Sequence, residues 1–241
     1  MAKERLDKVL GHMGVGTRRE VKLMVKAGRV RVDGAVADDP GAQVDPEQQE
    51  VLVDGQRLGY RKHFYLMLHK PPGVITATED PRKKTVMDVL PPEYKRPDLF
   101  PVGRLDRDTE GLLLLMTDGE LCHRLLSPRW HVDKRYYVRT DRPLEADDPA
   151  AFAAGLVLED GYACMPARLE ILASDEAIVT IQEGKYHQVK RMFLARGKTV
   201  TYLKRLSMGP MDLGGLPLGA VRYLTEAETD SLYESAGLAR P

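Results

Sequence analysis

The sequence contains little that is typical of membrane, secreted or redox proteins. Its 241 residues include only two cysteines, Cys122 and Cys164, which lie far apart and outside any CxxC motif. A disulfide framework or cysteine metal site is therefore not expected, and a reducing cytoplasm is the expected compartment. No apolar run approaches the length needed to cross a bilayer, and the opening MAKERLDKVL lacks the apolar core of a secretion signal. Nucleotide-binding loops and HExxH motifs are missing too, so we expect no cofactor and no metal.

The formal net charge is zero, but the charges are unevenly distributed along the chain. Residues 1–31 carry nine Lys/Arg against three acids, whereas residues 32–55 carry seven acids and no base. Residues 184–211 carry seven bases and no acid. Two such basic blocks favour contact with phosphates, although solvated basic helix faces are also common.

The first sixty residues predict a small module of two helices and two hairpins. Apolar residues recur at helical spacing before Gly14, and Thr17 with Glu20 fits a capping box that would start a second helix. RVRVDGAV and EVLVDGQRL each alternate around an Asp-Gly pair, which is typical of a hairpin. The module would be basic on its helical side.

A second region begins near residue 61. FYLMLHK predicts a strand, KPPG a turn, and GVITAT a further extended run. EDPRKKTVMDVLPPEYKRPD, which is punctuated by prolines, predicts a loop with a short helix at most. We find no internal repeat.

The stretch GRLDRDTEGLLLLMTDGE, residues 103–120, places a charged turn directly before an apolar run. LLLLM has the length and continuity of a strand buried on both faces. Thr117 and Glu120 fit a second capping box, with ELCHRLL as the helix. A carboxylate held at the edge of such a strand needs a nearby cation to remain ionised.

Three interpretations of the charged turn compete. Asp106 and Asp108 with their neighbouring arginines can form a surface ion-pair cluster. They can also be the acid and base of a glycosidase, because residues i and i+2 of a strand share a face. In the third interpretation, one aspartate is a lone nucleophile.

The motifs of the second region favour the third interpretation. GRLDRDTEGLLLLMTDG resembles the central motif of the pseudouridine synthases, in the branch that carries an N-terminal S4 RNA-binding module. KPPGVI, KRYYV, EGKYHQVKRMF and LKRLSMG resemble the other motifs of that branch and follow in the same order. RLD, TRRE and GRVRVDG resemble the S4 module over residues 3–50. Within the branch, GKYHQVKRMF is most similar to the enzymes that act on small-subunit rRNA.

The resemblance implies a role for each matching residue. Asp106 would be the nucleophile, acting on either the ribose anomeric carbon or the uracil ring, and Lys190 its cation, with Arg191 as the alternate. Tyr136 would stack on the target base, with Tyr137 facing the core, and Asp108 would only shape the turn. Arg104 would fill the gap left by the flipped base or hold a phosphate. RNA contact is implied for Arg5, Thr17, Arg18, Arg19, Lys22, Arg29, Lys70, Arg191 and Leu203, the last as an apolar pocket wall.

We therefore expect an α+β protein: an S4-like RNA-binding domain at residues 1–60 and a catalytic domain with a mainly antiparallel sheet at 61–241. The expected function is conversion of a uridine of ribosomal RNA to pseudouridine, with the closest-looking relatives indicating position 516 of 16S rRNA. A large-subunit (23S) uridine is one alternative. A non-catalytic ribosome-assembly factor is another, although it would have no need of Asp106, Tyr136 and Lys190. A glycosidase is disfavoured by the low aromatic content of 6%. A monomer is the default.

Overall fold

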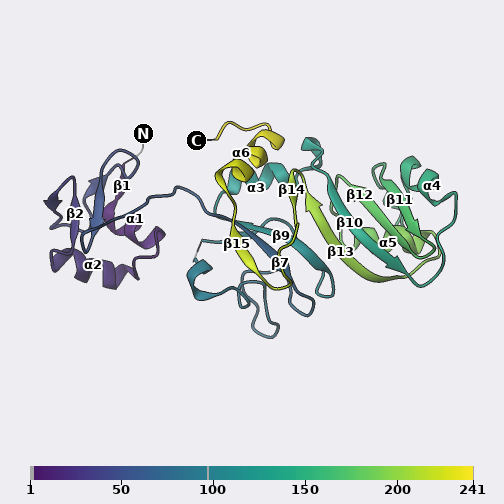
Figure 1. The fold of residues 1–241 in the computed structure, drawn as a ribbon, viewed down its shortest axis with the longest axis horizontal. Helices are drawn as coiled ribbons and strands as arrows, with labels where there is room; N and C mark the ends of the chain where they lie inside the picture. Colours follow the sequence, from purple (N-terminus) through teal and green to yellow (C-terminus); the bar gives the residue numbers. More distant parts are fainter. Residues whose placement is uncertain (1–2, 97, 241) are drawn as a thin grey trace. The chain divides into compact units, whose positions relative to one another are not determined.

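A computed structural model describes residues 3–96 and 98–240 and divides the chain into two compact units, 1–62 and 63–241 (Figure 1). The first unit is built around one apolar core and the second around two. No helix within the described ranges combines the length and apolarity that crossing a bilayer requires.

The first unit holds two short helices, α1 (Leu6–His12) and α2 (Arg18–Lys26). The Thr17–Glu20 capping box is present as predicted: the Thr17 hydroxyl accepts from the Glu20 N–H, and the Glu20 carboxylate accepts from the Thr17 N–H. Both Asp-Gly pairs turn the chain with positive φ, which Asp and Gly tolerate well, and so confirm the two hairpins. The strands are β1 (Glu4–Arg5), β2 (Val30–Val32), β3 (Ala35–Val36), β4 (Gln43–Val44), β5 (Val51–Val53) and β6 (Gln56–Arg57).

The second unit is organised around one sheet with the central order β11-β12-β10-β13-β9-β7-β15. Among the described strands, β9 and β13 pair in parallel and the remaining neighbours are antiparallel, which confirms the mainly antiparallel sheet. Short strands β8 and β14 pair with β9 and β13, respectively. The strands are β7 (Tyr65–Lys70), β8 (Phe100–Pro101), β9 (Glu110–Met116), β10 (Lys134–Thr140), β11 (Arg168–Ala173), β12 (Glu176–Ile181), β13 (Val200–Met208), β14 (Met211–Asp212) and β15 (Val221–Tyr223).

Strand β9 separates two apolar cores. Leu113 and Leu115 belong to one core, while Leu112 and Leu114 belong to the other, because successive side chains of a strand point to opposite faces. The predicted burial of this strand on both faces is therefore confirmed. Figure 1 shows α3 and α6 together near β15, and α4 and α5 at the β10–β12 half. The helices are α3 (Gly119–Leu126), α4 (Asp148–Ala154), α5 (Gln188–Ala195) and α6 (Glu226–Ser235), with 3₁₀ turns η1 (Pro92–Tyr94) and η2 (Pro128–Trp130).

Two predicted local features are wrong. The N-cap of α3 is Asp118, whose carboxylate accepts from the Leu121 N–H, and not Thr117. The Thr117 hydroxyl instead accepts a hydrogen bond from the Phe64 N–H, 3.0 Å away, at the start of the neighbouring strand. The predicted extended run GVITAT forms only an isolated bridge, between Ile75 and Thr85, and otherwise bends.

Candidate active site

The turn that carries Asp106 forms one wall of a cavity of about 530 Å³ in the second unit. Residues 184–187 also line this cavity, and strands β10 and β13 contribute Lys134, Tyr136 and Arg205 to its lining. A second hollow of about 60 Å³ shares Arg104 and Asp106 with the cavity and adds residues of α5 and Leu203. The main cavity is lined by Ile75, Thr76, Gly103, Arg104, Leu105, Asp106, Arg107, Leu126, Lys134, Tyr136, Gly184, Lys185, Tyr186, His187 and Arg205.

The Asp106 turn is fixed from both sides. Its neighbour Leu105 is buried, donates its N–H to the Thr76 hydroxyl at 3.1 Å, and accepts from the same hydroxyl at 2.8 Å. On the other side, the Thr109 N–H donates to the Asp106 carbonyl at 3.1 Å. These bonds hold the carboxylate without using any of its own oxygens.

Lys70 stabilises the same turn from inside, which contradicts the prediction that it contacts RNA. The side chain is completely buried, and its ammonium donates to the carbonyls of Thr109 at 2.9 Å, Pro71 at 3.1 Å and Arg107 at 3.4 Å. Burial lowers the pKa of Lys70 to about 8. The lysine therefore ties the KPPG turn to the Asp106 turn and is not accessible to a phosphate.

Two basic side chains converge on the Asp106 carboxylate. Lys190 Nζ lies 3.1 Å from Asp106 Oδ2, and His187 Nε2 lies 3.5 Å from Oδ1. Lys190 also pairs with Asp108 at 2.6 Å, so Asp108 does more than shape the turn. Burial lowers the pKa of Lys190, but hydrogen bonds to Asp108 and Asp106 outweigh it, and the pKa is raised overall.

The hydrogen bond from Lys190 also changes the pKa of the Asp108 carboxyl. Burial raises the pKa of its carboxyl, the hydrogen bond from Lys190 lowers it, and the balance leaves the pKa below its ordinary value. Both carboxylates therefore share one protonated lysine at the cavity edge.

A buried carboxylate that we did not identify from the sequence fixes the segment carrying His187 and Lys190. Glu183 is 2% exposed and accepts from the Gln188 amide at 2.6 Å and the Met165 N–H at 2.8 Å. Gln188 in turn accepts from the Lys185 N–H at 2.8 Å. The spacing of the glutamate and glutamine within EGKYHQVKR was the available sequence feature, but glutamate is rarely buried.

Tyr136 and Tyr137 lie on opposite faces of β10, as strand neighbours must. Tyr136 is 7% exposed, belongs to a core and borders the cavity, whereas Tyr137 is half-buried against Tyr202, with ring centroids 6.0 Å apart. The prediction that Tyr137 faces the core is therefore wrong. Arg104 is exposed at the cavity wall, and Leu203 is buried beside the smaller hollow.

Arg191 does not reach Asp106. Its guanidinium pairs with Asp160 at 2.5 Å, and this pair raises the pKa of Arg191. Of the two cations predicted for the carboxylate, the structure brings only Lys190 into contact with it.

The predicted RNA-facing residues of the first unit are mostly exposed. Arg18, Arg19 and Lys22 lie exposed on α2, and the Thr17 hydroxyl caps that helix. The remaining two are held in ion pairs, Arg5 with Asp7 at 2.8 Å and Arg29 with Asp54.

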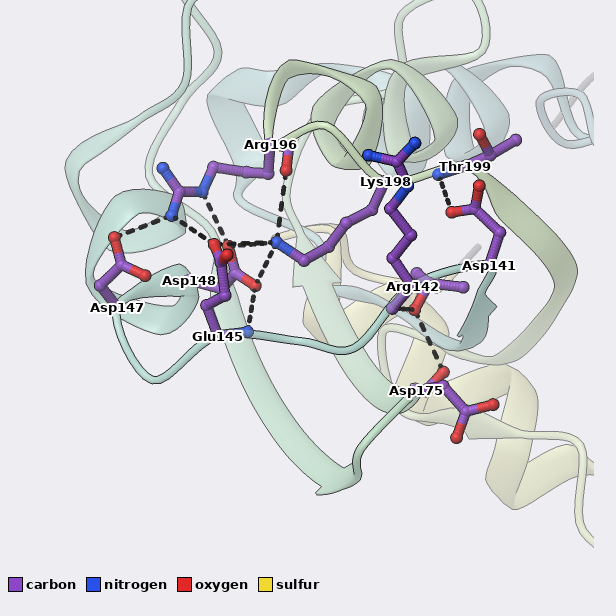
Figure 2. A network of polar contacts seen from close by, with 10 residues as sticks. Asp141, Arg142, Glu145, Asp147, Asp148, Asp175, Arg196, Lys198 and Thr199 are labelled. Carbon is purple, nitrogen blue, oxygen red and sulfur yellow. Dashed lines mark hydrogen bonds and ion pairs between the residues drawn. The ribbon is translucent and has the colours of Figure 1, made fainter.

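A group of three acids beside α4 is the one place in the described ranges where carboxylates gather closely enough to hold a metal: Glu145, Asp147 and Asp148. Figure 2 shows Arg196 and Lys198 pointing into this group. Lys198 Nζ lies 3.0 Å from Asp148 Oδ2, and Arg196 Nε lies 2.7 Å from Oδ1. The acids already have cationic partners, so the group is an ion-pair network that joins α4 to the chain after α5.

The cavity therefore combines a carboxylate with a lysine partner, an aromatic side chain and exposed arginines. Comparisons with known proteins define the class. Residues 64–195 match the family model of RNA pseudouridylate synthase, and residues 4–50 match that of the S4 domain.

The chain is also similar to individual proteins over nearly its full length. It is 50% identical to an uncharacterised RNA pseudouridine synthase of Bacillus subtilis, over 95% of this chain and 98% of the relative. It is 40% identical to ribosomal small subunit pseudouridine synthase A of Vibrio cholerae, over 95% and 100%. It is 37% identical to ribosomal large subunit pseudouridine synthase B of Bacillus subtilis, over 95% of each. A crystal structure of a pseudouridylate synthase matches with a TM-score of 0.66 and 34% identity, over 95% of this chain and 99% of that one.

The chain belongs to the RNA pseudouridylate synthase family and carries an N-terminal S4 domain. It is an enzyme that isomerises uridine to pseudouridine in RNA.

Proposed function

We propose that this enzyme modifies one uridine of 16S rRNA, at position 516, in the cytoplasm and as a monomer. The motif GKYHQVKRMF and the 40% identity to a small-subunit enzyme support this assignment. A 23S uridine is the second candidate, because a large-subunit enzyme is 37% identical over the same share of the chain.

Asp106 is the proposed nucleophile, and its placement in the cavity is the observation that carries the mechanism. A cation 3.1 Å away stabilises the ionised carboxylate, and Lys190 provides it. Attack on the ribose or the ring detaches uracil, which rotates and rejoins through carbon 5.

The remaining residues hold the substrate. Tyr136 stacks on the target base, which repays part of the cost of removing it from its helix. Leu203 supplies an apolar wall, and Arg104 occupies the gap left in the RNA or binds phosphate.

We assign docking to residues 1–60 and catalysis to residues 61–241. Phosphate contacts from the exposed face of α2 position the RNA without reading its sequence. That face and its neighbours comprise Arg5, Thr17, Arg18, Arg19, Lys22 and Arg29.

Pseudouridine mapping tests the proposal. The protein is incubated with unmodified 16S and 23S transcripts and with partly assembled small subunits, followed by carbodiimide treatment and primer extension. One new stop at position 516 of 16S rRNA is the expected result, and Asp106→Asn should abolish it while RNA binding persists. A stop only in 23S rRNA would reassign the substrate. Binding without any stop would favour an assembly factor.

A further inference from the structure

Tyr186 is an exposed aromatic residue at the mouth of the cavity. It lines the cavity with Asp106, yet 76% of its surface is accessible to solvent. Burying a tyrosine ring contributes strongly to packing, so a ring left this open contributes little to folding. Its ring lies flat against the His187 ring, with centroids 3.8 Å apart and planes 16° apart. One face is covered by His187, and the large exposure leaves the rest open to a ligand.

The segment that carries this ring pair is fixed before any substrate binds. Gln188 accepts from the Lys185 N–H and donates to the buried Glu183, and the Tyr186 carbonyl accepts from Arg191 at 3.4 Å. His187 also lies 3.5 Å from the Asp106 carboxylate. The open ring is therefore held at a defined place beside the reacting centre.

The cavity rim around Tyr186 is basic. Arg104 and Arg107 are exposed on the Asp106 turn and line the same cavity, and Lys185, also a lining residue, precedes Tyr186 in the chain. Within the described ranges, none of these three side chains makes an ion pair with an acid. Arg107 donates to the Gly73 carbonyl at 3.1 Å and Lys185 lies 5.1 Å from the Tyr162 ring centroid, contacts that leave their charges unneutralised. Cations without acidic partners beside an exposed aromatic ring are the combination that binds single-stranded nucleic acid, through phosphates and base stacking respectively.

We propose that the open face of Tyr186 stacks on an unpaired nucleobase next to the target uridine. The inference rests on the proposed function, since it assumes that the target uridine enters the cavity at Tyr136. A volume of about 530 Å³ is in the range that holds a drug-sized ligand, so it has room beyond one uracil ring. The Tyr186–His187 pair thus forms a second stacking position, and it restricts substrates to uridines with an unstacked neighbour.

Steady-state kinetics on a 16S rRNA transcript that contains the target uridine test the proposal. Tyr186→Ala should raise KM roughly 5- to 150-fold, the cost of one lost base–aromatic stack. Tyr186→Phe keeps the ring and should remain within about twofold of wild type. Leu194→Ala is the control, because Leu194 is 55% exposed on α5 and outside the cavity. A KM for Tyr186→Ala equal to that of Leu194→Ala would overturn the stacking position.

A base-deletion cycle makes the test specific. Abasic nucleotides replace the base on the 5′ or 3′ side of the target in turn. If the missing base is the one that stacks on Tyr186, the abasic RNA should raise the KM of the wild-type enzyme as much as Tyr186→Ala does with the intact RNA. The same abasic RNA should not raise the KM of Tyr186→Ala any further. If the effects of the abasic nucleotide and of Tyr186→Ala on KM were fully additive at both the 5′ and the 3′ position, the proposal would be refuted.

A binding measurement separates this inference from the proposed function. RNA carrying 2-aminopurine beside the target loses fluorescence when that base stacks, and no turnover is needed. Quenching by wild type but not by Tyr186→Ala would support the stacking position even if no pseudouridine formed. Turnover without quenching at either neighbour would refute the stacking position and leave the proposed function intact.

Discussion

Gly111→Ala should destabilise the second unit severely, although it adds only one methyl group. Gly111 begins the buried part of β9 and has a φ of 111°, a conformation that L residues rarely adopt. A Cβ there would lie 2.5 Å from the Arg205 amide nitrogen and 2.8 Å from its carbonyl carbon, and closer still to its oxygen. These are backbone atoms of the paired strand β13, so no side-chain rotation relieves the contact.

The magnitude follows from two costs. Placing an alanine in this backbone conformation costs about 1–3 kcal/mol. Forcing a methyl group into a filled space costs roughly another 1–3 kcal/mol. The sum of about 2–6 kcal/mol is a large part of the roughly 5–15 kcal/mol that stabilises a typical domain. For a unit of this size it corresponds to a fall in Tm of roughly 4–24 °C.

Urea unfolding followed by tryptophan fluorescence measures this effect selectively. Trp130 is the one tryptophan of the chain, and it packs against a core of the second unit. Gly119→Ala is the control, because a Cβ at this first residue of α3 meets no atom within 4 Å. It should be neutral or stabilising by up to about 1 kcal/mol. If the two variants unfolded at the same urea concentration, the steric argument would be refuted.

Three further changes test the site and its support. Lys190→Met should lower kcat by roughly 100-fold or more, while Lys190→Arg should retain most activity, because Asp106 needs a neighbouring cation. Tritium release from carbon 5 of labelled RNA measures kcat, and a wild-type rate for Lys190→Met would contradict the prediction. Glu183→Leu removes the acceptor of the Gln188 amide, the Met165 N–H and the Tyr162 hydroxyl, so kcat should fall with a loss of about 1–3 kcal/mol of stability; unchanged values would refute its positioning role. The Arg222 hydrogen bond lowers the pKa of Glu228 to about 2, so its stabilisation is present above pH 4.5 and disappears toward pH 2. The difference in urea midpoint between wild type and Glu228→Gln should therefore decrease toward zero as the pH falls from 4.5 to about 2. A difference that stayed constant over this pH range would contradict the prediction.

The features predicted correctly from the sequence depend on contacts between near neighbours. The Thr17–Glu20 capping box and both Asp-Gly hairpins are decided within four residues. The burial of β9 follows from the continuity of its apolar run. Motif resemblance supplied the family because the motifs follow in a fixed order along most of the chain.

The errors arise where a distant segment decides the outcome. Thr117 would cap α3 if its hydroxyl were free, but Phe64, 53 residues earlier, donates to it. Lysine is usually a surface residue, yet the Lys70 ammonium is buried because the fold brings together three carbonyls that accept hydrogen bonds from it. Glu183 is buried for a similar reason: Gln188 lies in its own motif, but its other two donors, Tyr162 and Met165, come from a segment 21 and 18 residues earlier.

The pairing of Lys190 with two carboxylates has a consequence for catalysis. Its contact with Asp108 is the shorter, at 2.6 Å, but the Asp108 side chain is 75% exposed and solvent screens that pair. The Asp106 side chain is 25% exposed, so its 3.1 Å pair is screened less. Under the proposed function, RNA entering the cavity would displace water from Asp106, which lines the cavity, and not from Asp108, which does not. The lower local dielectric would then strengthen the Asp106 pair. Lysine, as a point charge, can contact both acids from one nitrogen, so substrate binding would shift its interaction toward Asp106, the carboxylate that we propose as the nucleophile.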